Sequence, residues 1–166
     1  EEIRLQSDEM QVDVGAMAKG YIADRLKDFL VKKGVNSAII NLGGNVLCIG
    51  SKPNGTPFKI GIQKPFADRN ETEAVMDITG KSVVSSGIYE RCFKQGGKLY
   101  HHILNPQTGY PYENGLISVT IISDQSVDGD ALSTTCFALG LEDGLKFAEK
   151  KGVHAVFITE DYELHY

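Results

Sequence analysis

The spacing of hydrophobic and polar residues predicts a mixed fold of strands and about three helices. From Ala18 onward, apolar residues recur at helical spacing, and Gly34 marks the end of this helix. Residues 128–139 and 142–151 predict two further helices. Short apolar or alternating runs predict strands at residues 37–42, 46–49, 58–63, 74–79, 82–85, 89–93, 99–104, 116–122 and 153–159. Together these elements indicate an α+β fold with mostly antiparallel strands.

Turn sequences and chain length refine this picture. Gln95, Gly96 and Gly97 predict a hairpin turn, and the run Asn-Pro-Gln-Thr-Gly-Tyr-Pro at 105–111 predicts a structured turn. The 166 residues suffice for one hydrophobic core, and no internal repeat or linker rich in Pro, Gly or Ser divides them. We therefore expect residues 1–166 to form a single domain.

The charge balance excludes some classes of function. There are 17 Lys and Arg against 22 Asp and Glu, which gives a net charge of −5 and no basic stripe, so nucleic acid is not an expected partner. No segment has the roughly 18 apolar residues of a membrane helix. The chain begins without Met or a signal-peptide pattern, so we expect it to start inside a longer gene product.

The small-residue segment 13–21 opens the first predicted helix. Free N–H groups at a helix start favour phosphate, and Gly and Ala let a ligand approach the backbone. The segment lacks the Walker sequence and the G-x-G-x-x-G fingerprint. A Gly-rich helix entry with Asp13 as a turn or cap residue is the simpler interpretation.

The segment 41–45, Asn-Leu-Gly-Gly-Asn, places two amide side chains around a Gly pair. This pattern suits hydrogen bonding to a polar ligand. A hairpin turn or a β-bulge explains the same pattern without a ligand and is the more frequent explanation.

His101 and His102 lie in a predicted strand, so their side chains point to opposite faces and only one can face a given site. An imidazole suits a general base. The alternative is one exposed histidine and one half-buried histidine with its hydrogen bonds satisfied.

Asp130 and Thr134 stand four residues apart at a predicted helix start and share one face. A carboxylate and a hydroxyl are hard oxygen ligands that suit a magnesium ion. Simple N-capping of the helix by Asp128 or Asp130 explains the same pattern.

Six ordered segments together resemble one family. They are residues 13–21 followed by Asp24, and residues 38–45, 60–65, 84–90, 102–111 and 130–134. In their order and residues they resemble the FAD:protein FMN transferases, the thiamine-biosynthesis lipoprotein (ApbE) family of flavin transferases.

The resemblance implies a magnesium-dependent (Mg²⁺) enzyme that binds FAD, transfers its FMN half to a threonine of an acceptor flavoprotein, and releases AMP. It assigns metal binding to Asp130, Thr134 and a backbone carbonyl that we place at Ala16. It makes His102 the base that deprotonates the acceptor threonine. It places five residues in segments that line the FAD site: Lys19, Asn41, Gly43, Gly44 and Ser86.

The resemblance also implies that this chain is the C-terminal portion of a longer enzyme whose N-terminal section is missing here. Family members are typically exported and lipid-anchored to the cell membrane, so membrane contact is expected only through that missing section. Two other functions stay open. One is a non-catalytic FAD-binding module, and the other is a magnesium-dependent FAD pyrophosphatase that uses water and releases FMN and AMP.

Overall fold

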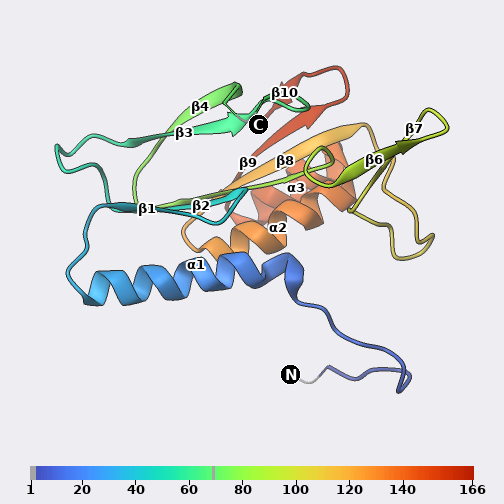
Figure 1. Ribbon diagram of the computed structural model, residues 1–166, viewed down its shortest axis with the longest axis horizontal. Coiled ribbons are helices and arrows are strands. Elements are labelled where there is room, and N and C mark those ends of the chain that lie inside the picture. Colours follow the sequence, from blue (N-terminus) through green and yellow to red (C-terminus); the bar gives the residue numbers. More distant parts are fainter. Residues whose placement is uncertain (1–2, 69) are drawn as a thin grey trace.

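A six-stranded antiparallel sheet organises the computed structural model, which describes residues 3–68 and 70–166 (Figure 1). The strand order is β1-β2-β5-β8-β9-β10, and every neighbouring pair is antiparallel. These strands are β1 (Ala38–Asn41), β2 (Asn45–Ile49), β5 (Ser82–Gly87), β8 (Leu116–Ser123), β9 (His154–Thr159) and β10 (Leu164–His165). Two separate hairpins are formed by β3 (Phe58–Gln63) with β4 (Thr72–Ile78) and by β6 (Cys92–Gln95) with β7 (Lys98–His101).

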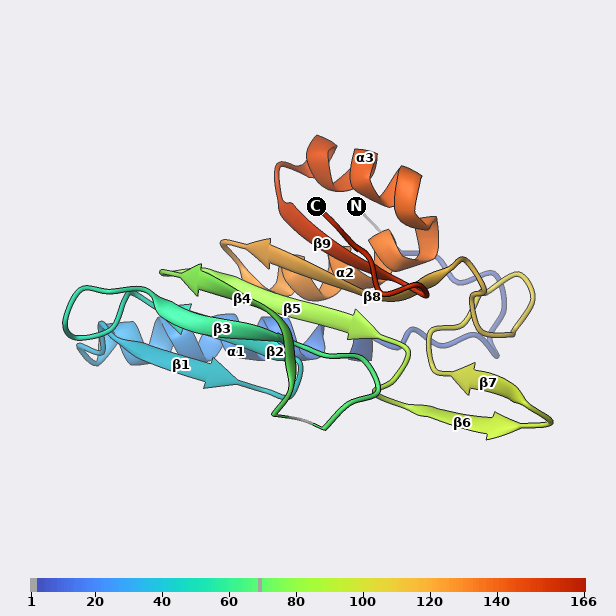
Figure 2. The ribbon, with the colours of Figure 1, turned by 90° about the horizontal axis from the view of Figure 1, so that it is seen from above.

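The helices and the β3–β4 hairpin cover opposite faces of the sheet (Figures 1 and 2). The helices are α1 (Gly15–Lys32), α2 (Ser126–Leu139) and α3 (Leu141–Lys151). Strand β8 is sandwiched between both layers, and all of its residues are buried, as expected for a strand covered on both faces. Within the described ranges, no helix is long and apolar enough to cross a lipid bilayer.

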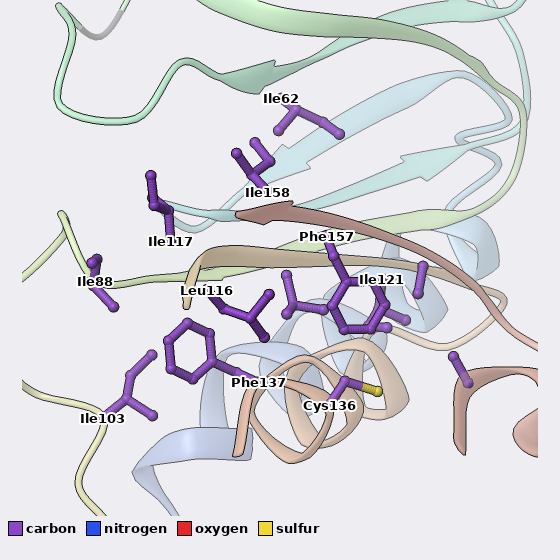
Figure 3. Close-up of a cluster of buried hydrophobic side chains, with 13 residues drawn as sticks. Ile62, Ile88, Ile103, Leu116, Ile117, Ile121, Cys136, Phe137, Phe157 and Ile158 are labelled. Atoms are coloured by element: carbon purple, nitrogen blue, oxygen red, sulfur yellow. The ribbon is translucent and has the colours of Figure 1, made fainter. Parts of the chain in front are cut away.

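The largest hydrophobic cluster among the described residues occupies both faces of the sheet (Figure 3). Most of its side chains lie between the sheet and α2 and α3, and Ile62 of β3 joins it from the opposite face. Phe137 of α2 and Phe157 of β9 lie at its centre, and both are fully buried. Ile103, just after β7, also enters this cluster. Burying a side chain of this size contributes about 1.5–3 kcal/mol, so Ile103 fixes the backbone of its neighbours against the core.

The predicted α+β fold is confirmed, and most predicted elements shift by at most three residues at their ends. The strand predicted at 89–93 is wrong at its start, because residues 88–91 form a turn and β6 begins at Cys92. The short strand β10 was not predicted. Both predicted turns are present. Gly96 and Gly97 adopt positive φ between β6 and β7, and the turn at 105–111 is closed by Asn105 N–H donating to the Tyr110 carbonyl.

The α1–α2 crossing depends on a residue without a side chain. Gly20 of α1 lies so close to the start of α2 that a Cβ atom there would be 2.3 Å from the carbonyl oxygen of Ser126 and 2.6 Å from Cα of Val127. Both neighbours are backbone atoms that cannot rotate away. Glycine is therefore required at this position if the two helices are to keep their separation.

His101 occupies a buried position where both ring nitrogens have partners. Nε2 donates to the Tyr112 carbonyl at 3.0 Å, and Nδ1 accepts the Ile103 N–H at 3.3 Å. The ring also makes an edge contact with Phe137. Burial lowers the pKa of His101, partly offset by the bond to the Tyr112 carbonyl. A second proton, on Nδ1, would face the Ile103 N–H, so this geometry also favours the neutral ring.

We predict that Gly20→Ala lowers the free energy of unfolding by about 1–3 kcal/mol, the usual cost of overpacking a tight contact. Urea denaturation followed by circular dichroism measures this change. Asp28→Ala, at an exposed position of the same helix, should change stability by no more than about 0.5 kcal/mol. Equal effects in the two variants would contradict the steric role of Gly20.

The lowered pKa of His101 predicts a loss of stability in mild acid. Below a pH of about 6.5, the ordinary histidine pKa, His101 binds a proton in the unfolded chain more readily than in the folded protein. The free energy of unfolding therefore falls as the pH decreases. Urea denaturation between about pH 7.5 and 5 tests this. His101→Gln keeps a donor and an acceptor but does not titrate, so its stability should fall less steeply. Identical slopes would rule out His101 as the source.

Candidate functional site

A cavity of about 770 Å³ opens where the start of α1, the β1–β2 loop, the end of β5, the segment after β7 and one side of α2 meet. Segments that are far apart in the sequence supply its walls. Most of the predicted site residues line it: Ala16, Lys19, Gly43, Gly44, Ser86, His102, Asp130 and Thr134. Asn41 does not line it. The structure therefore brings together all but one of the predicted residues.

The start of α1 forms one wall. Asp13 Oδ1 accepts the Gly15 N–H at 2.6 Å. Asp13 therefore orders the entry to the helix, which agrees with its interpretation as a turn or cap residue. The same segment also faces the cavity through Asp13, Gly15 and Ala16. Lys19, one turn further on, donates from Nζ to the Gly43 carbonyl at 2.6 Å. An ammonium has three donors, so two stay available toward the cavity.

The glycine loop is the turn of the β1–β2 hairpin, as its local pattern indicates. Gly43 and Gly44 adopt φ of +68° and +81°, in the left-handed region that favours glycine. Asn41 Oδ1 accepts the Gly43 N–H at 3.0 Å, so Asn41 shapes the loop from outside the cavity. The Gly44 carbonyl accepts the Ser85 N–H at 3.0 Å, which joins the loop to β5.

The N-capping interpretation of Asp130 is wrong. Helix α2 begins at Ser126, which places both Asp128 and Asp130 inside it. The cap comes instead from Asp24 of α1, whose two carboxylate oxygens accept the Ser126 and Val127 N–H groups, each at 2.9 Å. Asp24 follows the segment 13–21 in the family resemblance, but local spacing gives no sign of a partner more than 100 residues away.

The carboxylate of Asp130 contacts two other elements. Oδ2 accepts a short hydrogen bond from the Gly20 N–H of α1, and Oδ1 accepts the Asn45 amide Nδ2–H at 3.0 Å. In a regular α-helix the Gly20 N–H would donate to the carbonyl of Ala16. Asp130 therefore competes with the Ala16 carbonyl for this hydrogen, and Ala16 itself lines the cavity.

Thr134 lies one turn after Asp130 on the same side of α2, as predicted, and both line the cavity. Its Oγ1 is 3.1 Å from Ser86 Oγ, which is in turn 2.8 Å from Ser133 Oγ. Hydroxyls both donate and accept, so this cluster can keep an oxygen lone pair of Thr134 free.

The oxygen atoms around Asp130 fit a small hard cation. Asp130 is 8% exposed, and none of the ion pairs formed by the described residues includes it. Its two donors, Gly20 and Asn45, are neutral, and a carboxylate has about four lone-pair sites. A buried charge without an opposite charge is costly, and Mg²⁺ takes carboxylate, hydroxyl, carbonyl and water oxygens. Across residues 3–68 and 70–166, no group of three His, Cys, Asp or Glu side chains could hold a metal ion. A small hard cation in this cavity would therefore have Asp130 as its carboxylate ligand.

The two histidines point to different surroundings, as their alternation in the sequence predicts. His101 faces the core, whereas His102 is exposed and lines the cavity. The Arg91 carbonyl is 3.3 Å from Nδ1 of His102 and also accepts the His102 backbone N–H at 3.2 Å. A carbonyl can only accept, so Nδ1 carries a hydrogen and Nε2 of the neutral ring holds the lone pair. His102 can therefore accept a proton at Nε2.

Comparison with known proteins follows the same residues. The sequence model described as the ApbE family matches residues 1–157. A FAD:protein FMN transferase of Klebsiella pneumoniae is 47% identical over 161 residues, which are 96% of this chain and 49% of the relative. A FAD:protein FMN transferase of Treponema pallidum is 38% identical over 168 residues, covering 96% of this chain and 46% of the relative.

Solved structures agree with the sequence comparison. The ApbE protein of Thermotoga maritima superposes with a TM-score of 0.85 at 34% identity, covering 93% of this chain and 50% of that structure. The chain thus spans about half the length of the relatives it matches. Because the family match extends over nearly the whole sequence and the fold agrees, the chain belongs to the ApbE family.

Proposed function

We propose that this chain carries the catalytic site of an FAD:protein FMN transferase, which moves FMN from FAD to a threonine hydroxyl of an acceptor flavoprotein and releases AMP. The observation that carries the proposal is the shared cavity of Asp130, Thr134 and His102. It combines an uncompensated carboxylate with a base whose accepting nitrogen is free. The names of the relatives support the same activity.

The diphosphate of FAD would bind at the start of α1. A helix N-terminus attracts phosphate through its N–H groups and its dipole. Lys19 and Arg91 add two cationic side chains to the cavity lining. The absence of side chains at Gly43 and Gly44 lets a ligand approach the loop backbone closely.

The proposed magnesium site consists of Asp130, Thr134 and the Ala16 carbonyl. When bound there, Mg²⁺ would neutralise phosphate charge as the transferred phosphoryl group changes partners. The protein residues keep these oxygens in place: Gly20 and Asn45 fix the carboxylate, and Ser86 contacts the hydroxyl. Export and lipid anchoring stay predictions from the family resemblance.

The reaction balances with one proton transfer. The threonine oxygen of the acceptor bonds to the phosphorus on the riboflavin side of FAD, and the bond from that phosphorus to the bridging oxygen breaks. AMP leaves with the bridging oxygen, and Nε2 of His102 takes the hydroxyl proton. Positioning and charge neutralisation supply most of the catalysis in this class of reaction.

One assay distinguishes the proposal from the two other functions. The full-length protein is incubated with FAD, Mg²⁺ and an acceptor flavoprotein domain, and the products are separated by mass spectrometry. Covalent flavin on the acceptor together with AMP supports the transferase. Free FMN with AMP indicates a pyrophosphatase, and bound FAD without either product indicates a binding module.

We expect His102→Ala to slow FMN transfer about 10²- to 10⁴-fold, the usual contribution of a general base, with FAD still bound. Single-turnover transfer at saturating FAD measures the change. His154→Ala, at an exposed histidine of β9, is the matched control and should transfer at the rate of the unmodified protein. Transfer that persists at full rate in His102→Ala would remove this histidine from the mechanism.

Asp130→Ala should abolish transfer together with its dependence on magnesium, because the carboxylate is the charged ligand of the proposed site. A ligand worth several kcal/mol of charge stabilisation corresponds to a loss of more than about 10²-fold. Asp128→Ala, two residues earlier on the exposed face of α2, serves as control. Circular dichroism must show both variants folded, since Asp130 also pairs with buried donors. Undiminished turnover in Asp130→Ala would limit this residue to a structural role.

A further inference from the structure

The buried amide of Asn45 connects Asp130 to a line of hydroxyl groups inside the protein. Asn45 is 1% exposed and begins β2, directly after the glycine loop. Its Nδ2 donates to Asp130 Oδ1 at 3.0 Å, and its Oδ1 accepts the Ser126 hydroxyl at 2.7 Å. Ser82 Oγ donates to Ser126 Oγ at 3.0 Å. The four side chains form one chain of hydrogen bonds that ends at the carboxylate.

The charge of Asp130 fixes the direction of every bond in this chain. An ionised carboxylate only accepts, so the Asn45 atom facing it must be the NH₂ group. The carbonyl oxygen of that amide then faces Ser126, whose single hydroxyl hydrogen must point to it. Ser126 in turn has only lone pairs to offer Ser82. Aligned hydrogen bonds of this kind polarise one another in the low dielectric of the interior.

The chain also limits how the carboxylate can turn. The Gly20 N–H holds Oδ2 and Asn45 holds Oδ1, so both oxygens have fixed partners on two different elements. Rotation of the carboxylate would break one of these bonds and leave a buried donor unpaired, which is costly. The remaining lone pairs therefore keep one orientation.

We propose that Asn45 is a positioning residue, held in orientation by Ser126 and Ser82, that sets the direction in which Asp130 offers its free lone pairs to a divalent cation. This inference rests on the proposed function, since it concerns the same magnesium site. Outer partners of metal ligands commonly change metal affinity about 10- to 100-fold when they are removed. Asn45 itself contacts neither substrate nor metal in this proposal.

The test measures metal binding and needs no turnover. Mn²⁺, which favours oxygen ligand sets like those of Mg²⁺, is titrated into the full-length protein, and the free ion is followed by its EPR signal. Asn45→Leu keeps the branched shape and the number of side-chain heavy atoms but has no donor, and it should bind Mn²⁺ about 10- to 100-fold more weakly. Ser126→Ala frees the Asn45 amide to turn, and it should weaken binding about 2- to 10-fold, the value of one hydrogen bond.

Thr120→Val is the matched control. Thr120 is fully buried in the same sheet and its hydroxyl is 2.7 Å from Ser85 Oγ, and none of the hydrogen bonds of the Asp130 chain described above includes it. It should bind Mn²⁺ within about twofold of the unmodified protein, because well-separated sites act independently. All titrations are made at a temperature where circular dichroism shows each variant fully folded.

Each outcome decides the proposal. Weaker binding in Asn45→Leu and Ser126→Ala, with Thr120→Val unchanged, supports it. Affinity equal to that of the unmodified protein in Asn45→Leu overturns it, and if that variant does not fold, Ser126→Ala decides in the same way. If Thr120→Val weakens Mn²⁺ binding as much as the other variants do, the effect is a general one on the core and the proposal is overturned. If the unmodified protein binds no Mn²⁺, the proposed metal site fails too, whereas binding that the variants leave intact removes only the positioning role.

Discussion

The reciprocal exchange of carboxylates between α1 and α2 is the constraint on which the site depends. Asp24 of α1 accepts two N–H groups at the start of α2, and Asp130 of α2 accepts the Gly20 N–H of α1. The exchange requires the helices to lie as close as Gly20 allows. It fixes α2 in both position and rotation, because each carboxylate is anchored on the backbone of the other helix. Asp130 and Thr134 face the cavity as a result.

The charges in the cavity show why a metal suits the proposed reaction. Its lining holds three carboxylates, Asp13, Glu90 and Asp130, against two cations, Lys19 and Arg91. A bound diphosphate would add negative charge to a cavity whose lining already carries more carboxylates than cations. The acidic composition of the chain thus does not exclude a phosphate ligand, provided that the positive charge comes with a cation such as Mg²⁺.

Local sequence rules predicted the parts of the fold and site that are themselves local. Asp130 and Thr134 share a face because helical spacing requires it, and the Gly43–Gly44 turn follows from residues that tolerate positive φ. The hydrogen bonds that hold the carboxylates of Asp130 and Asp24 join positions 85 to 110 residues apart. Capping rules consider only neighbouring residues, so they offered Asp128 or Asp130 as the cap of α2 and overlooked Asp24.

The error in the strand predicted at 89–93 lies next to the candidate site, because Glu90 and Arg91 line the cavity. The Tyr89 ring packs edge-on against Phe66 and lies close over Gly87, where a Cβ would be 2.7 Å from the ring. The chain turns at 88–91, where these contacts of Tyr89 replace the alternation of a strand. At the end of this turn the Arg91 carbonyl lies against Nδ1 and the backbone N–H of His102. The backbone bond between His102 and Arg91 continues the β6–β7 pairing by one residue pair beyond Cys92 and His101. Because the same carbonyl also faces Nδ1 of the His102 ring, Nε2 is left as the accepting nitrogen.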